Sequence, residues 1–130
     1  LFDDAIATLD TLRSRGHVLG LITNGPKWLQ RKKIATFEIE PYFDVVVIEG
    51  EFGHGKPNAA VFEHALKATK TEAAAAWHTG DNQYADIGGA QKAGIHAVWI
   101  HRDRMELDAA HPVPDRAIAK LDELVAAIES

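Results

Sequence analysis

Residues 78–102 read HTGDNQYADIGGAQKAGIHAVWIHR, and this stretch decides the fold class. It opens at the end of an apolar strand and continues through the polar triplet Gly80-Asp81-Asn82. A helix over about 84–93 follows, and an apolar strand over 95–101 comes next. Two strands joined by a helix of this length predict a parallel β-α-β unit.

The same alternation of helices and strands extends over the whole chain. Short apolar runs predict strands that are buried on both faces, and three-to-four spacing predicts the helices. We therefore expect a single domain over 1–130, with an α/β, three-layer αβα, Rossmann-like architecture built on a parallel sheet. The predicted helices cover 2–15, 26–37, 57–68, 84–93 and 121–128, the strands cover 17–22, 44–48, 74–79, 95–101 and 116–118, and a glycine-rich loop covers 50–55.

Composition narrows the class of function. The 130 residues are 46% hydrophobic and 25% charged, with a formal net charge of −5, which argues against a nucleic-acid or anionic-lipid surface. No apolar run approaches the roughly 18 residues of a membrane span. The chain has no cysteine, which fits a cytoplasmic protein. We expect a small-molecule partner, and composition predicts no oligomeric state.

Three polar clusters follow predicted strands. In an open parallel sheet, ligands bind beyond the carboxyl ends of the strands, so these clusters should converge. With Asp86 they supply a hydroxyl, backbone N–H groups, a lysine and two carboxylates, which together can hold a phosphoryl group and Mg²⁺. The clusters are Thr23-Asn24-Gly25, Gly55-Lys56-Pro57 and Gly80-Asp81.

Each cluster also has a simpler interpretation. The Thr23-Asn24-Gly25 triplet suits a turn, and Lys56 suits a solvated loop. Asp81 suits a helix cap, and Asp86 suits the first turn of a helix. Only their occurrence in order on one α/β scaffold favours a site.

The order of these polar clusters along the chain resembles that of the haloacid dehalogenase-like superfamily. The stretches LGLITNG (19–25), GHGKPNAAVFEHAL (53–66) and residues 78–102 are similar to its second, third and fourth motifs. They look closest to those of phosphoglycolate phosphatases and nucleotidases. The resemblance implies a Mg²⁺-dependent phosphohydrolase that acts on small phosphorylated metabolites through an aspartyl-phosphate.

The resemblance also implies roles for individual residues. Thr23 would hydrogen-bond the transferring phosphoryl group, helped by the backbone of Asn24 and Gly25. Lys56 would offset negative charge on the nucleophile and on the phosphoryl oxygens. The two acids of the fourth motif, Asp81 and Asp86, would hold Mg²⁺.

Other polar and aromatic residues carry weaker signals. The seven histidines include no pair at zinc-like spacing. His54 is a loop residue or a substrate contact, and Trp28 either packs on its helix or lines the entrance. Trp77 and Trp99 fall within strands and are expected in the core.

The family's first motif, Asp-x-Asp-x-Thr/Val after an apolar strand, has no match in the chain. The pair Asp3-Asp4 lies in a helical pattern, so we reject it as the nucleophile. In the family, that first strand is central, between the strands of the second and fourth motifs. We expect the domain to be incomplete at its N-terminus, with this strand and its nucleophile upstream of Leu1 or supplied elsewhere. No cap domain fits between Thr23 and Lys56, and the chain alone should be inactive.

Two alternatives to a phosphatase remain. One is a 2-haloacid dehalogenase, which needs no metal, although Thr23 and Asp81 favour the phosphatase because dehalogenases tend to carry other residues there. The second is a catalytically inactive domain kept for binding or regulation, which the absent nucleophile supports. Retention of the lysine and both acids opposes it.

Overall fold

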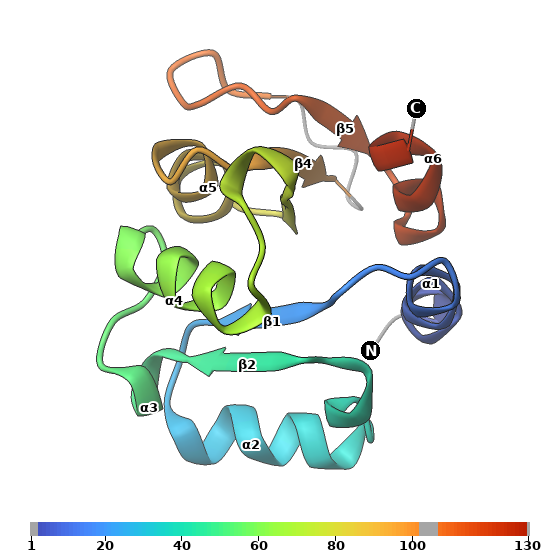
Figure 1. Cartoon of the computed structure of the whole chain (residues 1–130). Helices are drawn as coiled ribbons and strands as arrows, with labels where there is room; N and C mark the ends of the chain where they lie inside the picture. Colours follow the sequence, from blue (N-terminus) through green and yellow to red (C-terminus); the bar gives the residue numbers. More distant parts are fainter. Residues whose placement is uncertain (1–2, 102–106, 130) are drawn as a thin grey trace.

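The computed structural model describes residues 3–101 and 107–129, and Figure 1 shows the chain. Strands and helices alternate as predicted, and no helix within the described residues is long and apolar enough to cross a membrane. The elements in chain order are α1 (Asp3–Ser14), β1 (Gly20–Thr23), α2 (Lys27–Thr36), η1 (Glu40–Tyr42), β2 (Val45–Ile48), α3 (Glu49–Phe52), α4 (Ala59–Thr69), η2 (Ala73–Ala75), β3 (Trp77–Gly80), η3 (Gln83–Gly88), α5 (Gly89–Lys92), β4 (His96–Ile100), β5 (Arg116–Ile118), η4 (Leu121–Glu123) and α6 (Leu124–Glu129).

The strands form two parallel sheets. Strand β1 pairs with β2, and Gly20 lies opposite Val45 in that register. The second sheet has the order β3-β4-β5, and Trp77 lies opposite His96. Within the described residues no ladder joins β1 to β3, so each of these strands has one edge without a strand partner. This break lies where the sequence predicted a central strand.

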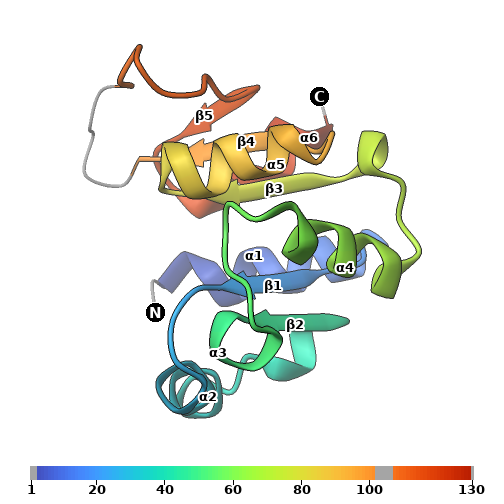
Figure 2. The same ribbon diagram turned by 90° about the vertical axis from the view of Figure 1, so that its left-hand side faces the viewer.

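Helices cover both faces of the strands. Figure 2 shows α4 and α5 on one side and α1 on the other. The core under α4, η3 and α5 is built around Phe62, Ile87 and Trp99, and the core under α1 and α6 is built around Leu12 and Val98. The predicted three-layer α/β architecture is therefore confirmed.

Polar contacts link the two halves of the molecule at both ends of the strands. Near the strands' amino ends, the Glu129 carboxylate accepts hydrogen bonds from Arg15 Nε at 2.8 Å and His17 Nε2 at 2.7 Å. Near the carboxyl ends, Lys56 Nζ donates to Asp86 Oδ1 at 2.6 Å. The two halves of the molecule are thus tied together although their strands are not paired.

The structure differs from the predicted elements in several places. The strand expected over 17–22 is observed as Gly20–Thr23, and the strand expected over 74–79 begins only at Trp77 because Ala73–Ala75 form the 3-10 helix η2. The expected loop over 50–55 contains helix α3, because Gly50 packs against the β1–α2 turn: its N–H donates to Gly25 O at 3.0 Å, and a Cβ there would lie 2.5 Å from Lys27 N. The expected helix over 84–93 begins as a π-helix, η3, because Asn82 O accepts from both Asp86 N and Ile87 N. The predicted first helix began at Phe2, which lies outside the described residues.

Candidate active site

The structure brings the three predicted polar clusters together. Thr23 ends β1, Gly80 ends β3, and Lys56 lies between α3 and α4 in the connection that follows β2. Hydrogen bonds run from Asn24 to the Lys56 backbone and from the Lys56 ammonium to Asp86. Side chains that are 62 positions apart in sequence, Asn24 and Asp86, are therefore both bound to Lys56.

Asn24 fixes the loop that carries Lys56. Its side-chain Oδ1 accepts from Lys56 N at 2.8 Å, and its Nδ2 donates to Lys56 O at 3.0 Å, so the amide binds both backbone polar groups. Gly55 allows this close approach, because a Cβ there would lie 2.9 Å from Asn24 Oδ1 and 2.5 Å from Glu49 Oε2. The Asn24 side chain therefore serves as a clamp for the lysine.

The predicted phosphate-binding turn is partly engaged by protein groups. The Gly25 N–H donates to Glu49 Oε1 at 2.9 Å, and Gly25 has a φ of +121°, in the range that favours glycine. The Thr23 hydroxyl lies at a long 3.5 Å from Asn24 O, which is a weak hydrogen bond. The hydroxyl is therefore easily redirected to a ligand, whereas the Gly25 N–H would first have to leave Glu49.

Asp86 is the most buried acid of the predicted set. The residue is 3% exposed, and Oδ1 accepts from Lys56 Nζ at 2.6 Å and contacts His78 Nε2 at 2.9 Å. Burial alone would raise the pKa of Asp86, but the His78 hydrogen bond and the charge of Lys56 outweigh it and lower the pKa to about 2. Asp86 is therefore an ionised carboxylate throughout the neutral range.

Asp81 stands at the open end of the same site. Asp81 is exposed. Its backbone carbonyl accepts a hydrogen bond from Trp99 Nε1 at 2.9 Å, which fixes the backbone just after β3. Asn82 then caps η3 by accepting from Ala85 N at 2.8 Å. The wide first turn of η3 places Asp86 back against Gly80, where a Cβ would lie 2.5 Å from the Asp86 Cβ.

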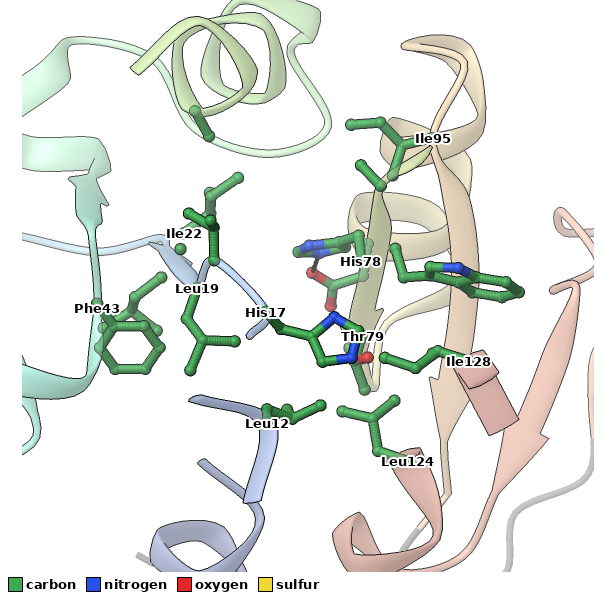
Figure 3. Close-up of a pocket in the computed structure, with 18 of the residues that line it drawn as sticks. Leu12, His17, Leu19, Ile22, Phe43, His78, Thr79, Ile95, Leu124 and Ile128 are labelled. Atoms are coloured by element: carbon green, nitrogen blue, oxygen red, sulfur yellow. Dashed lines mark hydrogen bonds and ion pairs between the residues drawn. The ribbon is translucent and has the colours of Figure 1, made fainter. Parts of the chain in front are cut away.

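A cavity of about 880 Å³ lies between β1 and β3 and ends at the acids. Figure 3 shows apolar side chains from both sheets and from α1 and α6 around it. Lys56, Asp81 and Asp86 line it, whereas Thr23, Asn24 and Gly25 are not among its described lining residues. The labelled apolar residues of this wall are Leu12, Leu19, Ile22, Phe43, Ile95, Leu124 and Ile128.

The donor chemistry of the site fits Mg²⁺. Asp81 and Asp86 provide hard oxygen donors at the cavity, and Mg²⁺ is commonly held by one or two carboxylates together with waters and phosphate oxygens. Within the described residues no group of three His, Cys, Asp or Glu side chains is placed to hold a metal ion. The residues thus suit an ion that keeps several waters, and they offer no histidine cage for zinc.

Two residues considered from the sequence lie away from the cavity lining. His54 is exposed and contacts Asn58 Nδ2 at 3.4 Å, and Trp28 is 71% exposed. The sequence pattern predicts no role for His78 or Glu49, which contact Asp86 and Gly25 respectively. A signal for His78 existed, because residues two apart in a strand share a face and Gly80 also faces Asp86.

The chain is similar to known proteins over most of its length. The family model described as haloacid dehalogenase-like hydrolase matches residues 1–100. A phosphoserine phosphatase from Thermus thermophilus is 38% identical over 124 residues, covering 95% of this chain and 49% of that protein.

Solved structures share the fold of this chain. The crystal structure of a HAD phosphatase from Thermococcus onnurineus matches with a TM-score of 0.90 and 33% identity, over 97% of this chain and 57% of that one. The crystal structure of a 2-haloacid dehalogenase from Pseudomonas syringae matches with a TM-score of 0.88 and 33% identity, over 99% and 53%. The chain spans about half the length of these relatives.

Proposed function

Because the chain belongs to the haloacid dehalogenase-like hydrolase family, we propose that it forms the core of a Mg²⁺-dependent phosphatase for phosphate monoesters of small metabolites. One observation carries this proposal: the partly buried pair of Lys56 Nζ and Asp86 Oδ1, 2.6 Å apart, at the polar end of the cavity. The pair supports the proposal because a cation and a carboxylate side by side are the groups that a phosphoryl group and its counter-ion would need.

Each side chain of the site has a separate role in the proposed phosphoryl transfer. Lys56 offsets the negative charge of a carboxylate nucleophile approaching a phosphate dianion, and the Thr23 hydroxyl donates to an equatorial phosphoryl oxygen. Asp81 and Asp86 would hold Mg²⁺, which when bound neutralises charge on the phosphoryl oxygens. Asn24 keeps the lysine in place through its backbone, so catalytic geometry depends on a residue that need not touch the substrate.

The nucleophile belongs to a further strand in this proposal. Asp4, one of the two acids of the N-terminal pair, accepts a hydrogen bond from Leu121 N at 2.7 Å, which suits a structural role. An apolar strand inserted between β1 and β3 would fill the cavity and pair with both strand edges. If that strand runs parallel to its neighbours, its carboxyl end lies beside Lys56 and delivers an aspartate to the site.

The proposed reaction then has two steps. The aspartate carboxylate attacks phosphorus, the bond to the ester oxygen breaks, and an acid gives the leaving alcohol its proton. Water next hydrolyses the aspartyl-phosphate, which releases inorganic phosphate and restores the carboxylate. Substrate choice is assigned to a cap outside the described residues, since the connection from Thr23 to Lys56 holds only short elements.

The test is phosphate release from a panel of small phosphomonoesters that includes phosphoserine. It uses the 130-residue chain and the protein expressed with whatever coding sequence precedes Leu1. We expect turnover that EDTA abolishes and that Asp81→Asn removes, whereas Asp122→Asn, at an exposed acid of η4, keeps it.

Two other outcomes would replace the proposal. Halide release from a 2-haloacid that is insensitive to EDTA would identify a dehalogenase, as in one of the solved relatives. Binding of phosphorylated compounds without turnover in either form would identify an inactive binding domain.

A further inference from the structure

His78 is a largely buried polar side chain of the site, and the proposed mechanism leaves it unused. It lies in β3, its side chain is 14% exposed, and Figure 3 shows its ring projecting into the cavity. The ring edge packs against Phe62, with centroids 5.0 Å apart and an interplanar angle of 88°. The ring is therefore held from behind by the core while its Nε2 reaches Asp86 Oδ1 at 2.9 Å.

The direction of this hydrogen bond follows from the charge of its partner. A carboxylate only accepts hydrogen bonds, so His78 Nε2, which lies 2.9 Å from Asp86 Oδ1, carries an N–H and is the donor in this contact. Oδ1 thus receives two donors, because Lys56 Nζ also binds it at 2.6 Å. The second oxygen, Oδ2, receives the Asn82 N–H at a longer 3.2 Å.

The two carboxylate oxygens of Asp86 are therefore not equivalent. Oδ1 is anchored by a histidine and a lysine, whereas Oδ2 is more weakly bound and lies against Gly80, the residue before Asp81. Without the His78 donor, Oδ1 would depend on the flexible lysine alone, and the carboxylate could rotate.

We propose that His78 is a positioning residue that, by donating from Nε2 to Oδ1, turns Oδ2 of Asp86 toward a divalent cation shared with Asp81. This inference rests on the proposed function, because it assigns the cation to these two acids. Partners that orient metal-binding carboxylates typically change metal affinity by 10- to 100-fold when removed. His78 touches neither the substrate nor the reacting atoms in this account, so its effect should appear in cation binding rather than only in turnover.

The experiment measures Mn²⁺ binding by electron paramagnetic resonance and Mg²⁺ binding by calorimetry. The protein is the same extended form used to test the proposed function. His78→Gln can place an N–H near the position of Nε2, so we expect its Mn²⁺ affinity to stay within about threefold of wild type. His78→Leu keeps the apolar packing on Phe62 but has no donor, and it should bind Mn²⁺ about 10- to 100-fold more weakly.

A third variant guards against misfolding. His78→Asn is polar but too short to reach Oδ1, so it should weaken Mn²⁺ binding as His78→Leu does. Wild-type Mn²⁺ affinity in either His78→Leu or His78→Asn overturns the positioning role. In wild-type protein, ¹⁵N NMR of the imidazole should show the proton on Nε2, and a proton on Nδ1 alone would also overturn it.

Asp86→Asn separates this inference from the proposed function. If Asp86→Asn leaves Mn²⁺ binding unchanged, the cation site is not at these acids, and the proposed function fails with it. If Asp86→Asn abolishes Mn²⁺ binding while the histidine variants bind normally, only the role of His78 is wrong.

Discussion

Replacing Gly80 by alanine should disrupt the candidate site from within the strand. A Cβ at this position would overlap the carboxylate of Asp86 and lie 2.5 Å from its Cβ, whereas carbon atoms in contact lie about 3.5–4.0 Å apart. Asp86 must therefore move by about 1 Å, which would stretch its 2.6 Å contact with Lys56 beyond hydrogen-bonding distance. Leaving a buried charge without its partner typically costs about 3–5 kcal/mol, and we expect Gly80→Ala to lower the free energy of unfolding by that amount.

The assay is urea unfolding followed by tryptophan fluorescence, with two matched comparisons. Gly20→Ala, also at a strand glycine, places its Cβ 3.0 Å from the Val45 Cγ1 methyl and at an ordinary 3.9 Å from Val45 O, and it should change stability by less than about 1 kcal/mol. In an Asp86→Gly background the nearest atoms are gone, so the added cost of Gly80→Ala should fall below about 1 kcal/mol. A cost for Gly80→Ala no larger than that for Gly20→Ala would refute the packing argument.

Three further predictions concern the core residue Phe62, the Glu129 contacts near the amino ends of the strands, and Lys56. Phe62→Ala, at a residue 1% exposed, should cost about 3–5 kcal/mol in urea unfolding, whereas Phe37→Ala, at 42% exposure, should cost under about 1 kcal/mol. Glu129 has its pKa lowered from 4.5 to about 2 by its Arg and His hydrogen bonds, so it stabilises the fold above about pH 4.5 and loses this effect as pH falls toward 2. Glu129→Gln should therefore be less stable than wild type at pH 6, and the gap should close toward pH 2; a gap constant with pH would contradict this. In the extended protein, Lys56→Met should lower kcat about 10²- to 10³-fold, and unchanged turnover would remove the lysine from the mechanism, while Lys27→Met should be silent.

Much of the fold follows from local signals in the sequence. The strand over 116–118 was predicted at its observed bounds, and α4 was predicted over 57–68 and observed over Ala59–Thr69, with Asn58 capping its first turn. Helix α1 is followed by Gly16 at a φ of +86°, a conformation that glycine adopts without strain. These features depend on residues close in sequence, so hydrophobic periodicity and the residues that cap or end an element suffice to predict them.

The missed features depend on contacts between distant parts of the chain. Helix α3 forms where Gly50 meets the β1–α2 turn, and no local pattern encodes that approach. The amide of Asn24 binds the backbone of Lys56 across 32 positions. The sequence predicted that the polar clusters would converge, because carboxyl ends of parallel strands share an edge. The hydrogen-bond partner of each side chain at that edge depends on packing, which the sequence pattern does not specify.

The ion pair of Lys56 and Asp86 links the two halves of the molecule, and in the proposed function it would also serve the chemistry. Lys56 is anchored by Asn24 beyond β1 and binds Asp86 beyond β3, so this chain of hydrogen bonds crosses the end of the cavity between the two sheets. The proposed strand would fill the apolar part of that cavity and end beneath this crossing. An aspartate at its end would then compete with Asp86 for the single ammonium of Lys56. Asp86 Oδ1 also has the His78 contact at 2.9 Å, so in the proposed function Asp86 would keep a hydrogen-bond donor while the Lys56 ammonium turns toward the nucleophile.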